Sequence, residues 1–589
     1  MKKFLYSFLG TMAGIWLSVI LGGVLLLFTI VAFVGDMATS TTEIESGSVL
    51  RIDLSGIVVD QSTNATLMDV VQDNFDTQLS LSDITKSLDK AKDDSRIEGL
   101  ILDFNGASIG MAQCAEIIDA INKFKASGKW VWSYADSYTQ GDYFIAAAAD
   151  SIFLNPVGTI DIHGLSGQVI FFKELMDKLG IEAQIVKVGT YKSAVEPFML
   201  NSMSEANRQQ MTHYIGRIWN CMKQDIANNR HTSADSVDTW ANMFSFSLAA
   251  SDYINMKMVD GLKYAREIDS LVIEKTQTTE AQYVNLNSYC SEFAANTFAS
   301  NKSSAKRIAV LYAVGDITES GETGIASDRL VPEILELTKN ENIDGLILRV
   351  NSGGGSAFAS EQIWEALENF KAKTGKPFYV SMCDMAASGG YYISCGADSI
   401  YASPYTLTGS IGIFGIIPNV KSLVKDKLGV NMESVETNTG NMPTILEPMT
   451  AEQRQAMQNN VNRGYELFVK RCADGRGMTV DQIKAIAEGR VWDGTSALEN
   501  GLVDKLGGLS VAINDMALAL GCDIENVEIA EYPKVEKEWW ETLAAMEAGN
   551  AMSILSGETS LTEEMYNEFM QRIREIDPLQ YRTNYIILK

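Results

Sequence analysis

The chain has 589 residues, of which 46% are hydrophobic and 21% are charged. This length exceeds what one ordinary hydrophobic core accommodates, so we expect two large domains or a duplicated one. The formal net charge of −27 argues against a nucleic-acid-binding protein, because phosphate recognition requires a basic surface.

Residues 4–35 contain no charged side chain, and about 20 apolar residues are enough to cross a bilayer. The sequence predicts a retained transmembrane helix here. A cleaved signal peptide is the alternative, but the run is longer than the usual core of about 7–15 residues and no clear cleavage site follows it. Lys2 and Lys3 precede the run and Asp36 follows it, so we expect the N-terminus in the cytoplasm and the rest of the chain outside.

The two halves of the chain are similar to each other. Three pairs of segments match: 96–104 with 342–350, 119–129 with 366–376, and 149–153 with 397–401. The first pair reads as a continuously apolar strand, GLIL, and the second as a helix that ends at Gly-Lys. Alternation of strand and helix predicts an α/β fold with mostly parallel strands, built from two tandem domains.

The duplication gives predicted domain boundaries. They are 1–40 for the cytoplasmic end and anchor, 41–300 for the first repeat, 301–535 for the second repeat and 536–589 for a helical tail. The tail could cap the second domain, contact a neighbouring subunit or lie at the membrane interface, and capping is the default expectation.

Cysteine and histidine usage indicates no metal site. The seven cysteines have no CxxC spacing, so neither a metal site nor a disulfide framework is expected. Cys383 and Cys395 flank the stretch 384–392, DMAASGGYY, and could be close in space. The histidines, His163, His213 and His231, all fall in the first half.

The halves differ at two reactive positions. Sliding one half onto the other sets Gln140 opposite Ser388, so the first half lacks the serine. A second comparison sets Lys192 near Asn441, so the second half lacks the lysine. Each half keeps one reactive residue that the other lacks, which predicts one composite site.

Ser388 is a candidate nucleophile, because its small neighbours would expose the hydroxyl and leave backbone N–H groups free. By itself such a turn is a weak signal, since most are plain connections. The stretch 349–356, RVNSGGGS, supports it: glycines after a buried strand permit a turn that binds an anion. A phosphate loop is the rival interpretation, but the pattern GxxxxGK[ST] is absent. The matching first-half loop, 105–110, has lost the glycine run.

Lys192 is the candidate base for Ser388. Its neighbours in 189–198, GTYKSAVEPF, are small, β-branched or aromatic, and burial among them would lower the lysine pKa until the neutral amine accepts a proton. A surface lysine is the bland alternative. No histidine occupies the half that carries the serine.

Four motifs together resemble the signal peptide peptidase A family, in its long duplicated bacterial form also called protease IV. They are 189–198, 346–356 (LILRVNSGGGS), 384–392 and 404–412 (PYTLTGSIG). The resemblance implies a Ser/Lys dyad, with Ser388 as nucleophile and Lys192 as general base. It also implies tandem Clp-protease/crotonase-like domains and a ring-like homo-oligomer, a tetramer, on the outer face of a bacterial cytoplasmic membrane.

The resemblance suggests further site residues. Ser410 would hydrogen-bond the lysine, and the N–H groups of Gly354, Gly355 and Gly389 are candidates for the oxyanion hole. The family commonly has NSPGG where this chain has NSGGG at 351–355, which loosens the turn without removing its donors.

The resulting expectation is a membrane-anchored serine endopeptidase that degrades cleaved signal peptides through an acyl-enzyme. Its partners would be hydrophobic peptides and the membrane, with no nucleic acid, metal or organic cofactor. Two alternatives share the fold: a crotonase-type acyl-CoA enzyme and a catalytically inactive membrane scaffold. The sequence leaves open whether Lys192 meets Ser388 of its own chain or of a neighbour.

Overall fold

The computed structural model describes residues 14, 44–61, 78–299, 305–321, 323–438 and 440–534. The predicted membrane span at 4–35, apart from Gly14, and the predicted tail at 536–589 lie outside the described residues. None of the helices in the described ranges combines the length and apolarity that crossing a membrane requires. The described residues between 44 and 534 belong to one compact unit.

The first repeat is built around a parallel sheet with the strand order β8-β6-β5-β4-β1-β9. Its strands are β1 (Ser48–Leu54), β4 (Ile97–Phe104), β5 (Trp130–Ala135), β6 (Ser151–Leu154), β8 (Gly261–Leu262) and β9 (Tyr283–Asn285). Two short strands, β2 (Ile57–Val59) and β3 (Gln78–Ser80), pair separately. The predicted strand at 48–60 is therefore interrupted, at Gly56, whose positive φ of 68° turns the chain.

The helices of the first repeat connect these strands. They are α3 (Leu81–Ala91), α4 (Met111–Ala126), α5 (Gln140–Ala146), α6 (Lys173–Leu179), α7 (Glu196–Met199), α8 (Glu205–Asn229), α9 (Ala234–Asn242), α10 (Ala250–Asn255), α11 (Ala265–Thr276) and α12 (Leu286–Ala299), with 3₁₀ turns at Ser193–Val195 and Ser245–Ser247. Helix α4 ends before Gly128, as the Gly-Lys signal predicts.

The second repeat has a corresponding sheet with the order β18-β16-β14-β13-β10-β20, in which β15 also pairs with β14 and β19. Its strands are β10 (Lys306–Val314), β13 (Gly345–Ser352), β14 (Phe378–Ala387), β15 (Ser399–Ala402), β16 (Leu407–Gly409), β18 (Val491–Asp493), β19 (Lys505–Leu506) and β20 (Val527–Tyr532). All pairs are parallel except β16 with β18.

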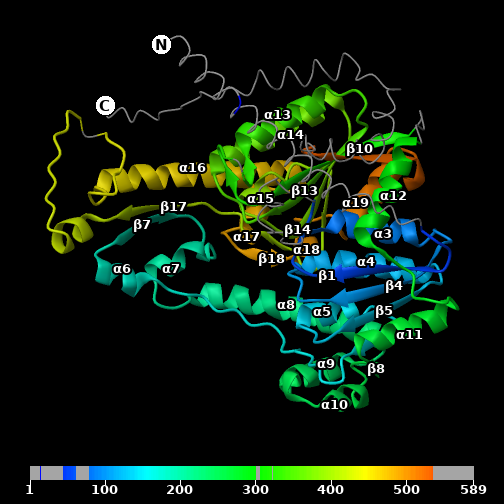
Figure 1. The fold of residues 1–589 in the computed structure, drawn as a ribbon. Coiled ribbons are helices and arrows are strands. Elements are labelled where there is room, and N and C mark those ends of the chain that lie inside the picture. The colour runs from blue at the N-terminus through cyan, green and yellow to red at the C-terminus, as the bar shows by residue number, and fades with distance from the viewer. Residues whose placement is uncertain are drawn as a thin grey trace, which may run out of the picture. The chain divides into compact units, whose positions relative to one another are not determined.

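The helices of the second repeat also connect its strands (Figure 1). They are α13 (Ser327–Lys339), α14 (Ala357–Thr374), α15 (Gly389–Tyr392), α16 (Ala451–Arg476), α17 (Val480–Ile486), α18 (Gly494–Glu499) and α19 (Leu509–Ala519), with a π-helical turn at Leu423–Lys427 and a 3₁₀ turn at Ile524–Asn526. A two-stranded sheet, β11 (Ile317–Thr318) with β12 (Ile325–Ala326), lies apart from the main one.

The duplication is confirmed by matching hydrogen bonds in the two repeats. The hydroxyl of Tyr143 donates to the carbonyl oxygen of Met258 at 2.8 Å. In the second repeat, the hydroxyl of Tyr391 donates to the carbonyl oxygen of Leu502 at 2.9 Å. An ion pair is also repeated: Arg230 pairs with Asp260 in the first repeat, and Arg476 pairs with Asp504 in the second. The predicted mixed α/β class with mostly parallel strands is therefore confirmed for both halves.

The central strands owe their stability to burial on both faces. In β4 and β13 the GLIL segment is fully buried, and its leucine and isoleucine side chains pack against the helices on either side. Each repeat has a large hydrophobic cluster of its own.

One antiparallel ribbon joins the repeats directly. Strand β7 (Glu182–Lys187) of the first repeat pairs with β17 (Phe414–Asn419) of the second. Figure 1 shows this ribbon beside α6 and α16. It matters for the site because the chain continues from β7 to Lys192 and reaches β17 from Ser410.

Candidate active site

Ser388 lies at the junction between β14 and the short helix α15. Its backbone has φ 54° and ψ −116°. Residues other than glycine rarely adopt this conformation, which costs about 1–3 kcal/mol. The Ser388 N–H donates to the carbonyl oxygen of Gly409 at 2.9 Å, which holds the turn. A serine on a strained strand-to-helix turn presents its hydroxyl outward, and this is how many enzymes carry a nucleophile.

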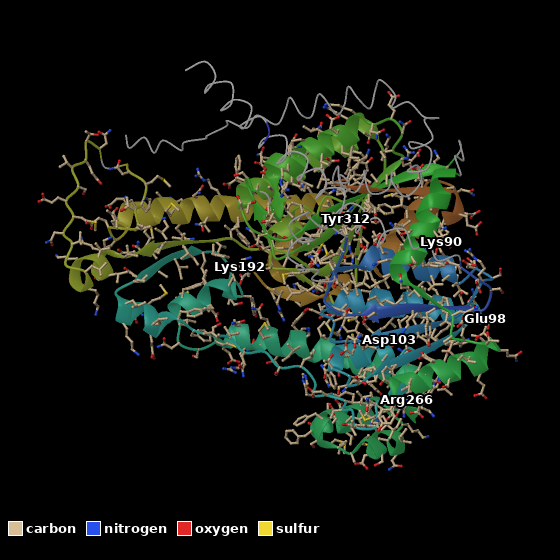
Figure 2. The ribbon with its side chains drawn as sticks, viewed as in Figure 1. Lys90, Glu98, Asp103, Lys192, Arg266 and Tyr312 are labelled. Carbon is tan, nitrogen blue, oxygen red and sulfur yellow. The ribbon has the colours of Figure 1, made fainter. Side chains whose placement is uncertain are left out.

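Lys192 reaches this serine from the first repeat of the same chain. Its Nζ donates hydrogen bonds to Oγ of Ser388 at 2.9 Å, to Oγ of Ser410 at 2.9 Å and to the carbonyl oxygen of Ser410 at 3.0 Å. Figure 2 labels Lys192 where the chain that follows β7 meets the second repeat. The structure thus brings together the two residues that the halves keep separately, and it does so within one chain.

The surroundings of Lys192 favour its neutral form. The side chain is 3% exposed, and burial lowers its pKa from 10.5 to about 8. Among the described residues no carboxylate lies within ion-pair distance of Nζ. Nζ lies over the ring of Phe414, 5.9 Å from its centroid, and over no other aromatic ring among the described residues. At neutral pH a fraction of the amine can therefore accept a proton.

Ser410 completes the environment of the amine. It follows β16 with a φ of 51°, and its N–H donates to the carbonyl oxygen of Arg490 at 2.7 Å. Its hydroxyl and carbonyl oxygens both face Nζ of Lys192. The strained backbone of Ser410 thus presents two oxygens to one nitrogen, which limits the rotation of the lysine side chain.

The glycine loop contributes backbone N–H groups beside Ser388. The N–H of Gly354 donates to Oγ of Ser352 at 3.1 Å. The N–H groups of Gly355 and Gly389 have no hydrogen-bond acceptor among the described residues, and a Cβ on Gly389 would lie 3.1 Å from the nitrogen of Gly355. Two unused donors are thus close together next to the serine.

The first repeat shows why the glycine run matters. There the N–H of Ser108 is used by the protein itself, because it donates to the carbonyl oxygen of Gly56 at 2.7 Å. At the equivalent bridge in the second repeat, Ile317 donates to the carbonyl oxygen of Gly354 at 3.0 Å, and Gly355 makes no such bond. Gly354 and Gly355 have φ values of 102° and 158°, so the altered path depends on glycine.

Gln140 occupies the position in the first repeat that corresponds to Ser388. Its Oε1 accepts hydrogen bonds from the N–H groups of His163 at 2.9 Å and Gly164 at 2.8 Å, and its Nε2 donates to the carbonyl oxygen of Gly164 at 3.0 Å. The side chain is buried, and both the oxygen and the nitrogen of its amide bond to the loop at 163–164. It therefore serves a structural purpose and offers no nucleophile.

A segment that the sequence analysis did not single out holds Lys192 in place. The N–H of Tyr191 donates to the carbonyl oxygen of Glu488 at 2.9 Å. Gly489 lies against Lys192 so closely that a Cβ on it would be 2.6 Å from Cβ of the lysine. The only available signal was a glycine in the motif GRVWDG at 489–494, which resembles an ordinary turn.

Arg490 strengthens the same contact between the repeats. Its guanidinium carbon lies 5.0 Å from the centroid of the Tyr191 ring in the first repeat and 4.2 Å from that of Trp492 in the second. Cation–π contacts of this kind contribute about 0.5–2 kcal/mol each. The residues just after α17 thus pack against the loop that carries Lys192 and hold it in place.

The cysteines and acidic residues form no metal site in the part of the chain that the structure describes. Cys383 and Cys395 are both buried and have free thiols with different neighbours. Sγ of Cys383 donates to Oδ1 of Asp60 at 3.3 Å, and Sγ of Cys395 donates to the carbonyl oxygen of Tyr392 at 3.2 Å.

Comparison with known proteins identifies the family. The model of peptidase family S49 matches twice, at residues 123–278 and 370–523. Protease 4 of Haemophilus influenzae is 35% identical over 513 residues, which is 84% of this chain and 83% of that protein. The chloroplastic serine protease SPPA of Arabidopsis thaliana is 28% identical and covers 80% of this chain and 69% of its own length. A putative signal peptide peptidase SppA of Enterococcus faecium is 34% identical, but over 35% of this chain and 61% of its own length.

Proposed function

Because this chain belongs to peptidase family S49 and is a serine peptidase, we propose that it cleaves peptides through an acyl-enzyme on Ser388, with Lys192 as general base. The observation that carries the proposal is the 2.9 Å separation between Nζ of Lys192 and Oγ of Ser388, at an amine whose pKa is lowered to about 8 by burial. No observation favours the acyl-CoA enzyme or the inactive scaffold.

The reaction would proceed in two halves. Oγ of Ser388 attacks the carbonyl carbon of the scissile peptide while its proton passes to Nζ of Lys192. The ammonium then returns the proton to the departing amine, and the acyl group remains as an ester on Ser388. Water attacks this ester, Lys192 takes the proton of the water, and the carboxylic acid product leaves as Oγ regains a proton.

We propose that the tetrahedral oxyanion is bound by the N–H groups of Gly355 and Gly389. The proposal is supported by two observations: neither N–H has a hydrogen-bond acceptor among the described residues, and both lie beside Ser388. Gly354 contributes in a different way: a Cβ on it would lie 2.5 Å from the nitrogen of Gly389, so its lack of a side chain leaves that donor accessible. Its own N–H donates to Ser352. Ser410 would hold the lysine by its two oxygens.

The substrates we propose are cleaved signal peptides and similar hydrophobic peptides. Two large apolar side chains near the site are each 38% exposed: Met385, three residues before the serine, and Phe414, which faces Lys192. Exposed apolar groups beside a nucleophile suit apolar substrate side chains. The relative from Enterococcus faecium is named as a signal peptide peptidase, which agrees with this substrate class.

The cellular setting is part of the proposal. The uncharged run at 4–35 would anchor the chain in the bacterial cytoplasmic membrane, with the N-terminus inside and the catalytic repeats outside. The remaining expectations also belong here: the domain boundaries at 41–300 and 301–535, the Clp-protease/crotonase-like type of each repeat, and a homo-oligomer, a tetramer by resemblance.

Two variants test the function. Ser388→Ala and Lys192→Ala are prepared separately, and cleavage of a synthetic signal peptide is followed with each. Both should lose activity, and a fluorophosphonate should label the wild type but not Ser388→Ala. Full cleavage by either variant would contradict the dyad, whereas labelling of Ser388 without cleavage of any peptide would favour an acyl-transfer enzyme of another class.

A further inference from the structure

Arg349 is fully buried where the two repeats meet. It belongs to β13 of the second repeat, and its Nε and Nη2 donate to Oδ1 of Asp60 at 3.2 and 2.9 Å. Nη2 also lies 2.7 Å from Oε1 of Glu116. Asp60, just after β2, and Glu116, in α4, both belong to the first repeat. One guanidinium of the second repeat is therefore held by two carboxylates of the first.

The contacts continue from Arg349 to the strand that carries the nucleophile. Nδ2 of Asn351 donates to Oδ2 of Asp60 and to Oδ2 of Asp384, both at 3.4 Å, and Oδ1 of Asn351 accepts from the N–H of Met385 at 3.2 Å. Oδ1 of Asp384 accepts from the N–H of Ala112 at 2.8 Å, in the first turn of α4. We refer to Arg349, Asp60, Glu116, Asn351 and Asp384 as the inter-repeat network.

The approach of the repeats at this point is unusually close. A Cβ on Gly110, the residue before α4, would lie 2.0 Å from Oδ2 of Asp384. In Figure 1, α4 of the first repeat lies near α19 of the second, and the N–H of Leu509 in α19 donates to Oε2 of Glu116 at 3.1 Å. Side chains and backbone of both repeats are thus bonded around the same carboxylates.

The network lies next to the ends of two strands that lead into the candidate active site. Strand β13 continues from Arg349 and Asn351 into the loop that contains Gly355, and β14 continues from Asp384 to Ser388. Lys192, in contrast, belongs to the first repeat. The distance from Lys192 to Ser388 therefore depends on how the repeats are placed against each other, and the network bonds them at that place.

We propose that the inter-repeat network positions Ser388 and the glycine loop for Lys192, with Arg349 and Asp384 as positioning residues that touch no substrate. The inference rests on the proposed function of Ser388 and Lys192. Reaction geometry is sensitive to displacements of this kind, since a shift of about 1 Å can reduce the rate of an enzyme roughly 100-fold.

A purely structural purpose is the competing explanation, and it makes different predictions. Replacing a whole buried ion cluster by well-packed hydrophobic residues of similar volume is often neutral or stabilising, because the cost of desolvating the charges disappears together with their attraction, whereas removing one partner alone leaves a buried charge uncompensated. Such a replacement can therefore leave a folded protein in which only the fit between the repeats has changed.

The principal test is the triple variant Asp60→Asn/Glu116→Gln/Arg349→Met, which removes the charge of Arg349 together with those of its two carboxylate partners. We expect kcat for a signal peptide to fall roughly tenfold or more while KM changes by less than about twofold. We also expect the apparent pKa of kcat/KM to rise, because Lys192 would gain access to water. The control is Arg230→Met/Asp260→Asn, which removes an ion pair within the first repeat and should leave both quantities unchanged.

A milder variant keeps the proposal testable if the triple variant does not fold. Asp384→Ala removes the bond to the N–H of Ala112, and Ser233→Ala removes a comparable bond to the N–H of Ser236 at the start of α9. Asp384→Ala should lower kcat by at least about threefold with KM unchanged, and Ser233→Ala should not. Equal turnover in these two variants, or wild-type kcat and pH profile in the triple variant, would overturn the inference. The proposed function fails separately, if Lys192→Ala remains active.

Discussion

A Cβ at position 489 would lie 2.6 Å from Cβ of Lys192, closer than two such atoms ever approach. Gly489 also has a φ of 77°. The lysine that supplies the proposed base thus occupies space that a glycine of the other repeat leaves open, and the composite site extends beyond its reactive groups.

Gly489→Ala should displace the loop that carries Lys192 and lower kcat/KM roughly 100-fold, because the amine would leave hydrogen-bonding distance of Ser388. Steady-state hydrolysis of a signal peptide measures this. Gly216→Ala is the matched control, since a Cβ there meets nothing within 4 Å and the residue lies in α8. Wild-type activity in Gly489→Ala would show that the close contact has no bearing on the base.

Lys192→Met should stabilise the folded protein while abolishing activity. The pKa of Lys192 is lowered from 10.5 to about 8, so at pH 7 the folded state carries an ammonium in a site that disfavours charge. This costs roughly 3 kcal/mol in the free energy of unfolding. The cost is fully present below pH 8, decreases as the pH rises and is gone above 10.5.

Thermal or denaturant unfolding at two pH values checks this sign. The difference in stability between Lys192→Met and the wild type should be large at pH 7 and should shrink as the pH is raised toward 10. If Lys192→Met were less stable than the wild type at pH 7, burial of the charged amine would not destabilise the folded protein, contrary to this prediction.

Ser410→Ala should lower kcat roughly 10- to 100-fold, because Nζ of Lys192 loses a hydrogen-bond partner at 2.9 Å in a buried place. Ser394→Ala provides the comparison. It also removes a buried hydroxyl of the second repeat, but one that donates to the carbonyl oxygen of Gly390 at 2.6 Å. Similar kcat values for the two variants would remove Ser410 from the account.

Gly389→Ala tests the proposed oxyanion donors. The new Cβ would lie 2.6 Å from Oγ of Ser360 and 3.1 Å from the nitrogen of Gly355, so both donors should shift and kcat should fall by about 100-fold or more. At Gly353 a Cβ would meet only Sδ of Met385, at 3.1 Å, and that flexible side chain can move. Gly353→Ala should therefore retain most of the activity, and a loss as severe as that of Gly389→Ala would argue against the assignment of the donors.

The sequence supported the duplicated α/β architecture because it depends on local patterns. The GLIL runs became β4 and β13, and the segments that end at Gly-Lys became α4 and α14. The pairing of Ser388 with Lys192 was also predictable, since each half visibly lacks what the other retains and the motifs resemble a known family.

Contacts between distant residues were not predictable in the same way. Arg349 directly follows the apolar run GLIL of its strand, and nothing near it in the sequence points to Asp60, which is 289 residues away. Gly489 and Arg490 read as an ordinary turn until the fold places them against Lys192 and Tyr191. The use of the Gly354 N–H by Ser352 depends on a side-chain rotamer, which no glycine pattern specifies.

The rate at which a fluorophosphonate labels Ser388, followed from pH 6 to 10 in the wild type and in Lys192→Ala, tests the central claim most directly. A neutral Lys192 should accept the serine proton, so labelling of the wild type should rise with pH around an apparent pKa of about 8 and then level off. Lys192→Ala should label far more slowly, without this transition. Equal labelling rates and equal pH profiles in the two proteins would contradict the assignment of Lys192 as the base.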